Sequence, residues 1–133
     1  MEAIAALHAD SWQRHYRIAF TDHFLDEEAP GYLLDKWTGR FARPDPGRRT
    51  IFAEEADGTL AGLAHTVLDD DPTWGALLDN LHVRYGRKRQ GIGARLPSLT
   101  AQAVLAGRPR SGLYLNGTPR GLRYAWPAPA RLL

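Results

Sequence analysis

Hydrophobic residues recur at helical spacing over the first forty residues of the chain. One amphipathic helix is predicted over residues 3–19, on the spacing of Ile4, Leu7, Trp12, Tyr16 and Ala19. Thr21 and Asp22 can cap a short turn after it. A second helix is predicted over residues 32–41, where Leu33, Leu34, Trp37 and Phe41 share one face. Prolines and glycine at 44–47 then predict a loop.

The pattern changes to short strands from residue 50 onward. Strands are predicted over residues 50–55 and 60–68, joined at Asp57-Gly58, a dipeptide typical of hairpin turns. An acidic loop is expected at 69–71. The strand predicted over 75–83 is almost continuously apolar, which indicates burial on both faces and a central place in the sheet. A basic loop over 84–91, a helix to about residue 105 and a last strand over 112–115 complete a mixed α/β fold with a crossover helix.

Composition narrows the class of protein. The chain has 133 residues, 44% of them hydrophobic and 24% charged, values typical of one globular domain. It contains no cysteine, which excludes disulfides, thiolate metal sites and a cysteine nucleophile. No apolar run approaches the ~20 residues that span a bilayer, and Met1-Glu2 is unlike the start of a signal peptide. We therefore expect a cytoplasmic protein without a membrane partner.

The charges are distributed unevenly along the chain. Residues 1–79 carry 7 basic and 15 acidic side chains, whereas residues 80–133 carry 10 basic and none that is acidic. Such a basic half is typical of proteins that meet an anion, such as a phosphorylated cofactor or a nucleic acid. A nucleic-acid-binding module is thus one alternative, but aromatic residues do not alternate with the arginines of 84–95 as stacking platforms would.

The segment after the central strand has the features of a phosphate-binding site. A basic loop precedes Gly91-Ile92-Gly93, which opens the predicted helix. Unpaired backbone N–H groups at a helix start bind phosphate oxygens, and glycines let those oxygens approach the backbone closely. The segment is neither a Rossmann fingerprint, because a third glycine and a following acid are missing, nor a P-loop, because Gly-Lys-Ser/Thr is absent.

This segment resembles the cofactor motif of the GNAT-type N-acetyltransferases, Gln/Arg-x-x-Gly-x-Gly/Ala after a strand that ends Leu-x-Val. The pattern falls on residues 88–93, with Lys88 at the usual Gln/Arg position. Residues 4–12 also resemble the first helix of that family. The resemblance implies a GNAT-like domain over residues 1–115 with a mixed sheet and helices on both of its faces, followed by an atypical tail over 116–133. It further implies acetyl-CoA as the donor and an amine of a small molecule or a protein as the acceptor.

By the same resemblance, the backbone of the strand end pairs with the pantetheine arm and the glycine loop holds the diphosphate. The cofactor-binding residues are then Leu81, His82, Val83, Lys88, Arg89, Gln90, Gly91, Ile92, Gly93 and Ala94. Asp79 and His82 lie on the central strand and are the candidates for the general base. Glu54 and Glu55 on the hairpin are further possibilities. No metal is expected.

Both ends of the chain differ from the family pattern. The strand that precedes the first helix in the family has no counterpart here, so an open sheet edge and a homodimer are expected. Asn116-Gly117-Thr118-Pro119-Arg120 replaces the family's terminal elements, as a frameshift would produce, and Tyr124 is a poor substitute for the family's acidic tyrosine. An inactive acetyl-CoA-binding remnant, with loose packing over 116–133, is therefore the second alternative.

Overall fold

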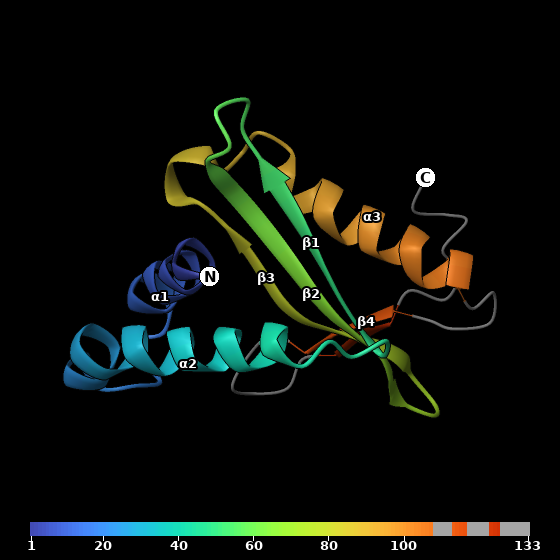
Figure 1. The fold of residues 1–133 in the computed structure, drawn as a ribbon, viewed down its shortest axis with the longest axis horizontal. Helices are drawn as coiled ribbons and strands as arrows, with labels where there is room; N and C mark the ends of the chain where they lie inside the picture. The colour runs from blue at the N-terminus through green and yellow to red at the C-terminus, as the bar shows by residue number, and fades with distance from the viewer. Residues whose placement is uncertain (108–112, 117–122, 126–133) are drawn as a thin grey trace.

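The computed structural model describes residues 1–107, 113–116 and 123–125, which form one mixed sheet with helices on both faces (Figure 1). The strand order is β1-β2-β3-β4-β5, and only the β3–β4 pair is parallel. The central position predicted for β3 is confirmed. The elements are α1 (Glu2–His15), η1 (Phe24–Glu28), α2 (Ala29–Ala42), β1 (Arg48–Glu54), β2 (Leu60–Asp71), β3 (Gly75–Val83), η2 (Tyr85–Arg87), α3 (Ile92–Gly107), β4 (Leu113–Asn116) and β5 (Arg123–Ala125).

The sheet separates two apolar cores. Helices α1 and α2 cover one face, where Leu33, Trp37 and Leu63 are fully buried. Helix α3 covers the other face, where Leu96 packs with Ala64 and Leu78. Figure 1 shows α1 and α2 on one side of the strands and α3 on the other. Burial of apolar side chains on both faces, at about 25 cal/mol per Å², is the main force that holds these layers together.

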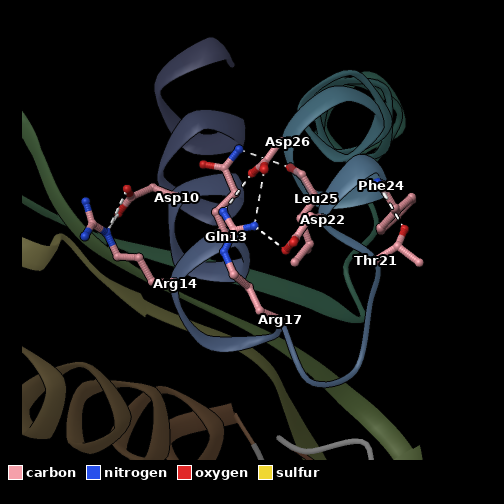
Figure 2. Close-up of polar contacts among 9 residues, drawn as sticks. All are labelled: Asp10, Gln13, Arg14, Arg17, Thr21, Asp22, Phe24, Leu25 and Asp26. Carbon is pink, nitrogen blue, oxygen red and sulfur yellow. Dashed lines mark hydrogen bonds and ion pairs between the residues drawn. The ribbon is translucent and has the colours of Figure 1, made fainter.

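The first helix is shorter than predicted. It ends at His15 because Tyr16 leaves the helical conformation with φ −117° and ψ 15°, so the extension to residue 19 is wrong. The turn that follows is capped as expected, since the Thr21 hydroxyl accepts a hydrogen bond from the Phe24 N–H at 3.2 Å. In the connection between α1 and η1, Arg17 forms ion pairs with Asp22 at 2.6 Å and with Asp26 at 2.8 Å (Figure 2).

The hairpin has the predicted turn, and its second strand is longer than predicted. Gly58 has φ +83°, and its N–H donates to the Glu55 carbonyl at 2.9 Å. The acidic segment expected as a loop instead continues β2 as far as Asp71. The Asp71 carboxylate accepts the N–H groups of Thr73 and Trp74 at 2.8 and 2.9 Å, so it closes the turn into β3.

A glycine in β2 sets how closely α3 approaches the sheet. A Cβ on Gly62 would lie 3.0 Å from the His82 carbonyl and 3.1 Å from side-chain atoms of Ile92 and Leu96. Because those contacts are tighter than ordinary van der Waals packing, only glycine lets the first turn of α3 rest directly on the strands. The start of α3 is thereby held next to the end of β3.

Pro97 lies inside α3, which begins at Ile92. A proline in a helix interior removes one backbone hydrogen bond and crowds the carbonyl one turn earlier, at a cost of ~3 kcal/mol. We expect Pro97→Leu to raise the unfolding free energy by about 1–3 kcal/mol. Urea denaturation measures this, and a lower transition midpoint for the variant would refute it.

The described part of the chain contains no helix long and apolar enough to cross a membrane. Most of the tail over residues 116–133 lies outside the described residues. The expectation that this tail packs loosely therefore concerns residues that the structure does not describe. Residues 123–125, for which the sequence predicted no element, form β5 and pair with β4 in the register Leu115↔Tyr124.

Candidate functional site

A β-bulge in the middle of β3 places two polar residues on the same face of the sheet. His65 of β2 pairs with Asn80 and the next residue, Thr66, pairs with Leu78, so Asp79 is the extra residue. The side chains of Asp79 and Asn80 lie together, with the Asn80 amide donating to Asp79 Oδ2. Arg40 of α2 reaches the same oxygen at 2.6 Å. Bulges of this kind redirect side chains and are frequent beside active sites.

Within the described residues, the pairing of β3 with β4 ends just before this bulge. Their pairing covers only Ala76↔Leu113 to Leu78↔Leu115, whereas β3 continues to Val83. The Arg84 N–H donates to the Ala61 carbonyl of β2 at 2.9 Å. Because peptide groups alternate in direction along a strand, those of Leu81 and Val83 then face away from β2, toward the β4 side. Among the described strands none pairs with this edge beyond Leu78, so within the described part of the chain these peptide groups have no strand partner and can bind an extended ligand.

His82 is buried between the sheet and α1. Its ring centroid lies 4.1 Å from that of His8, whose Nδ1 accepts the Trp37 Nε1–H at 3.1 Å. Neither ring nitrogen of His82 has a hydrogen-bond partner in the described part of the chain. Burial lowers the pKa of His82 to about 4 and that of His8 to about 2. Both rings are therefore neutral at pH 7, and both ring nitrogens of His82 are buried.

Two cationic side chains of α2 lie near Asp79 and His82. Arg40 pairs with Asp79 and also lies 4.9 Å from the Trp37 ring centroid. One turn earlier on α2, Lys36 is partly buried, and this burial together with the charge of Arg40 lowers its pKa. Asp79 is thus an oriented, ion-paired carboxylate, whereas His82 beside it is neutral and has no hydrogen-bond partner among the described residues.

The basic loop between β3 and α3 is held from two sides. On one side, the Arg87 guanidinium makes two hydrogen bonds of 2.6 Å to the Glu55 carboxylate of the hairpin. On the other, the Tyr85 ring lies 4.3 Å from the Arg14 guanidinium of α1 and 5.5 Å from the Lys88 ammonium. Lys88 Nζ also contacts His15 Nε2 at 2.7 Å. A loop fixed in this way loses little entropy when it binds a ligand.

The first turn of α3 presents free backbone donors. The Ala94 and Arg95 N–H groups both bond to the Gly91 carbonyl, at 3.2 and 2.9 Å. The N–H groups of Ile92 and Gly93 precede these bonds and, as at any helix start, have no intrahelical partner. Gly91 has φ +81°, and no atom lies within 4 Å of the position that its Cβ would occupy. Arg89 also has a positive φ, 66°. The helix dipole and the nearby cations favour an anion at this point.

The structure brings most of the sequence-predicted site residues to one end of β3. Asp79 and His82 share the face toward α1 and α2, and the glycine loop begins directly after Val83. Of the two hairpin glutamates considered as further bases, Glu55 forms an ion pair with Arg87. The sequence analysis did not identify Arg40 as a site residue, nor His8 as buried. His8 lies on the apolar face of its helix with Ile4 and Leu7, and this spacing could have predicted its burial. No group of three or more His, Asp or Glu side chains in the described residues could hold a metal ion.

Comparison with solved structures identifies the architecture. The PaiA N-acetyltransferase from Thermoplasma acidophilum, in complex with coenzyme A, is 18% identical with a TM-score of 0.63; the match covers 90% of this chain and 74% of that one. A ribosomal-protein-alanine N-acetyltransferase from Brucella melitensis biovar Abortus 2308 is 21% identical with a TM-score of 0.58, over 88% and 72% of the two chains. The chain has the GNAT fold. The fold class implied by the sequence resemblance is therefore confirmed.

A third GNAT structure shows how much of such a protein the chain covers. An aminoglycoside 6′-N-acetyltransferase in complex with coenzyme A is 19% identical with a TM-score of 0.55, and the match covers 84% of this chain. The match covers only 54% of the aminoglycoside enzyme, about half its length. No family model matches the chain, and no curated protein sequence matches it.

Proposed function

We propose that this GNAT-fold domain binds acetyl-CoA and transfers its acetyl group to an amine of a small molecule or a protein. The backbone direction at the end of β3 carries the proposal, because the peptide groups of Leu81 and Val83 face away from β2, along an edge that no described strand pairs with beyond Leu78. That edge leads directly to the first turn of α3. Two GNAT-fold proteins similar to this chain are described in complex with coenzyme A, which supports the same ligand here.

In this proposal the strand end and the loop divide the cofactor between them. The backbone of Leu81, His82 and Val83 lies along the pantetheine arm, as an added strand would. The diphosphate binds at the helix start, where the N–H groups of Ile92 and Gly93 have no intrahelical partner, with Lys88, Arg89, Gln90, Gly91 and Ala94 beside it. Lys88 and Arg89 form no ion pair with a carboxylate of the described residues, so their charge is available to phosphate.

Acetyl-CoA supplies the activated carbonyl, and the chain supplies the proton acceptor and the positioning groups. A backbone N–H on the open edge of β3 stabilises the negative charge that develops on the carbonyl oxygen. His82 and Asp79 are the two candidates for the base. We favour His82, because its ring nitrogens have no hydrogen-bond partner in the described chain, whereas Asp79 Oδ2 already accepts from Arg40 and Asn80.

Replacing His82 with glutamine tests the role of this ring. Loss of a general base costs about a hundredfold or more in turnover, so His82→Gln should lower kcat by that factor. Binding of acetyl-CoA should be unchanged, because the main-chain contacts remain. The exposed His23→Gln serves as the matched control. Equal turnover in the His82 and His23 variants would exclude His82 as the base.

The function itself is tested by thermal unfolding together with a thiol-release assay. A ligand that binds only the folded state raises the unfolding midpoint, so acetyl-CoA should raise it in a concentration-dependent way. Release of CoA thiol with a panel of primary amines then measures transfer. A midpoint shift without thiol release would indicate a binding domain that lacks catalysis, and no shift would contradict the proposal.

A further inference from the structure

The outer edge of β1 has main-chain groups directed away from the sheet. In the described sheet β1 is an edge strand with β2 as its neighbour. The Leu68 N–H donates to the Gly47 carbonyl at 2.7 Å, so odd-numbered residues of β1 direct their peptide groups toward β2. The peptide groups of Thr50 and Phe52 consequently point outward. An edge of this kind pairs readily with another extended chain.

Two hollows flank this edge, one on each face of the sheet. The first has a volume of about 840 Å³ and lies between β1 and α1, with Ile4, Leu7 and Asp10 in its wall. The second, of about 580 Å³, lies between β1 and α3 and includes Ile92 and Leu96. Phe52 and Glu54 line both. A strand added beside β1 would send alternate side chains into one hollow and then the other.

The charges of β1 are complementary to those of a second, antiparallel copy. If the two strands cross at Ile51, Arg48 of each copy lies opposite Glu54 of the other. The outward peptide groups of Thr50 and Phe52 then form the hydrogen-bonded pairs, as the alternation requires. Glu54 has no ion pair within the described residues. Arg48 has one, to the exposed Asp45 at 3.1 Å, and its guanidinium retains further donors.

The neighbouring register is less favourable. Two strands that cross at Phe52 would oppose Arg49 and Glu55, but Glu55 is already held by Arg87 at 2.6 Å. We propose that β1 pairs with β1 of a second copy about a two-fold axis at Ile51, which joins the two sheets into one. This pairing is isologous, so it closes as a dimer and does not propagate into a fibre.

Charge exchange tests the pairing without depending on the folding of one variant. Glu54→Arg places arginine opposite Arg48 in both pairs, and Arg48→Glu places glutamate opposite Glu54. Each should weaken the dimer about tenfold in sedimentation equilibrium, because cross-strand attraction becomes repulsion. An equimolar mixture of the two variants should restore dimerisation, since every cross-strand pair is then Arg–Glu. A wild-type chain that stays monomeric up to hundreds of micromolar, or single variants as dimeric as wild type, would overturn the proposal.

Cysteine substitution fixes the register, because the natural chain has no cysteine. At a position opposite itself in an antiparallel pair the Cα atoms lie about 4.5 Å apart, within the range that a disulfide spans. Ile51→Cys should therefore oxidise to a covalent dimer. Phe52→Cys alone should not, because its copies lie diagonally at about 7–8 Å, but a mixture of Thr50→Cys and Phe52→Cys should. Faster cross-linking of Phe52→Cys than of Ile51→Cys would contradict the register.

Discussion

Replacing Gly91 with valine is expected to abolish acetyl-CoA binding. The position of its Cβ is open, and the backbone there has φ +81°, which a β-branched residue adopts only under strain. The side chain would occupy the space proposed for the diphosphate. Each charge-assisted hydrogen bond contributes about 1.5–3 kcal/mol, so the loss of two weakens binding roughly a hundredfold or more. Isothermal titration calorimetry measures this directly.

Gly58→Val provides a control with the same backbone strain. Gly58 has φ +83° and equally open space, but it lies in the hairpin turn. Both variants should lose stability to a similar degree, whereas only Gly91→Val should lose affinity. Unchanged affinity in Gly91→Val, or an equal loss in Gly58→Val, would show that the loop does not bind the diphosphate.

The second large effect concerns stability in mild acid. Burial lowers the pKa of His8 to about 2, and the pKa of His65 and of His82 to about 4, each from 6.5. Lys36 contributes to all three shifts, and Asp79 opposes those of His65 and His82. The unfolded chain therefore binds protons below pH 6.5 that the folded chain does not. The stability that the neutral rings provide is present above pH 6.5. It is lost as the pH falls toward 4 for His65 and His82, and toward 2 for His8.

Lowering the pH from 7 to 5 should reduce the unfolding free energy by on the order of 2 kcal/mol for each ring. Three rings together approach the whole stability of an ordinary domain. Urea denaturation at several pH values measures the slope, and most carboxyl groups titrate below this window. His82→Gln should flatten the slope, because it removes one of the three buried rings. A stability that does not vary between pH 7 and 5 would contradict neutral, buried histidines.

Local pattern was sufficient to predict the elements that carry the proposed site. The nearly continuous apolar run predicted the bounds of β3, 75–83. It also predicted a central place in the sheet, because a short strand with apolar side chains on both faces must be covered on both faces. The turn at Asp57-Gly58 and the helix start after Gly91 were also predictable, since both depend on residues that adopt a positive φ. The basic loop with Lys88 and the glycines after it predicted the anion-binding site that is proposed here.

Features that depend on distant partners were not predictable in this way. The bulge at Asp79 arises from the register between β2 and β3, and the sequence alternation of β3 does not reveal it. Arg40 meets Asp79 across 39 positions of the chain. His8 is 1% exposed, because it packs against His82 and accepts the hydrogen bond from Trp37, partners that lie far from it in the sequence. Tertiary contacts of this kind override local preference.

The most direct test of the proposed acetyl-CoA site is amide hydrogen exchange at β3, resolved by NMR. Acetyl-CoA laid along the open edge should accept hydrogen bonds from the Leu81 and Val83 N–H groups and slow their exchange. The His82 N–H faces β2 and serves as the internal control, because its exchange should not change. Slower exchange at Leu81 and Val83 alone is the result predicted here. Exchange that stays unchanged at both positions under saturating acetyl-CoA would contradict it.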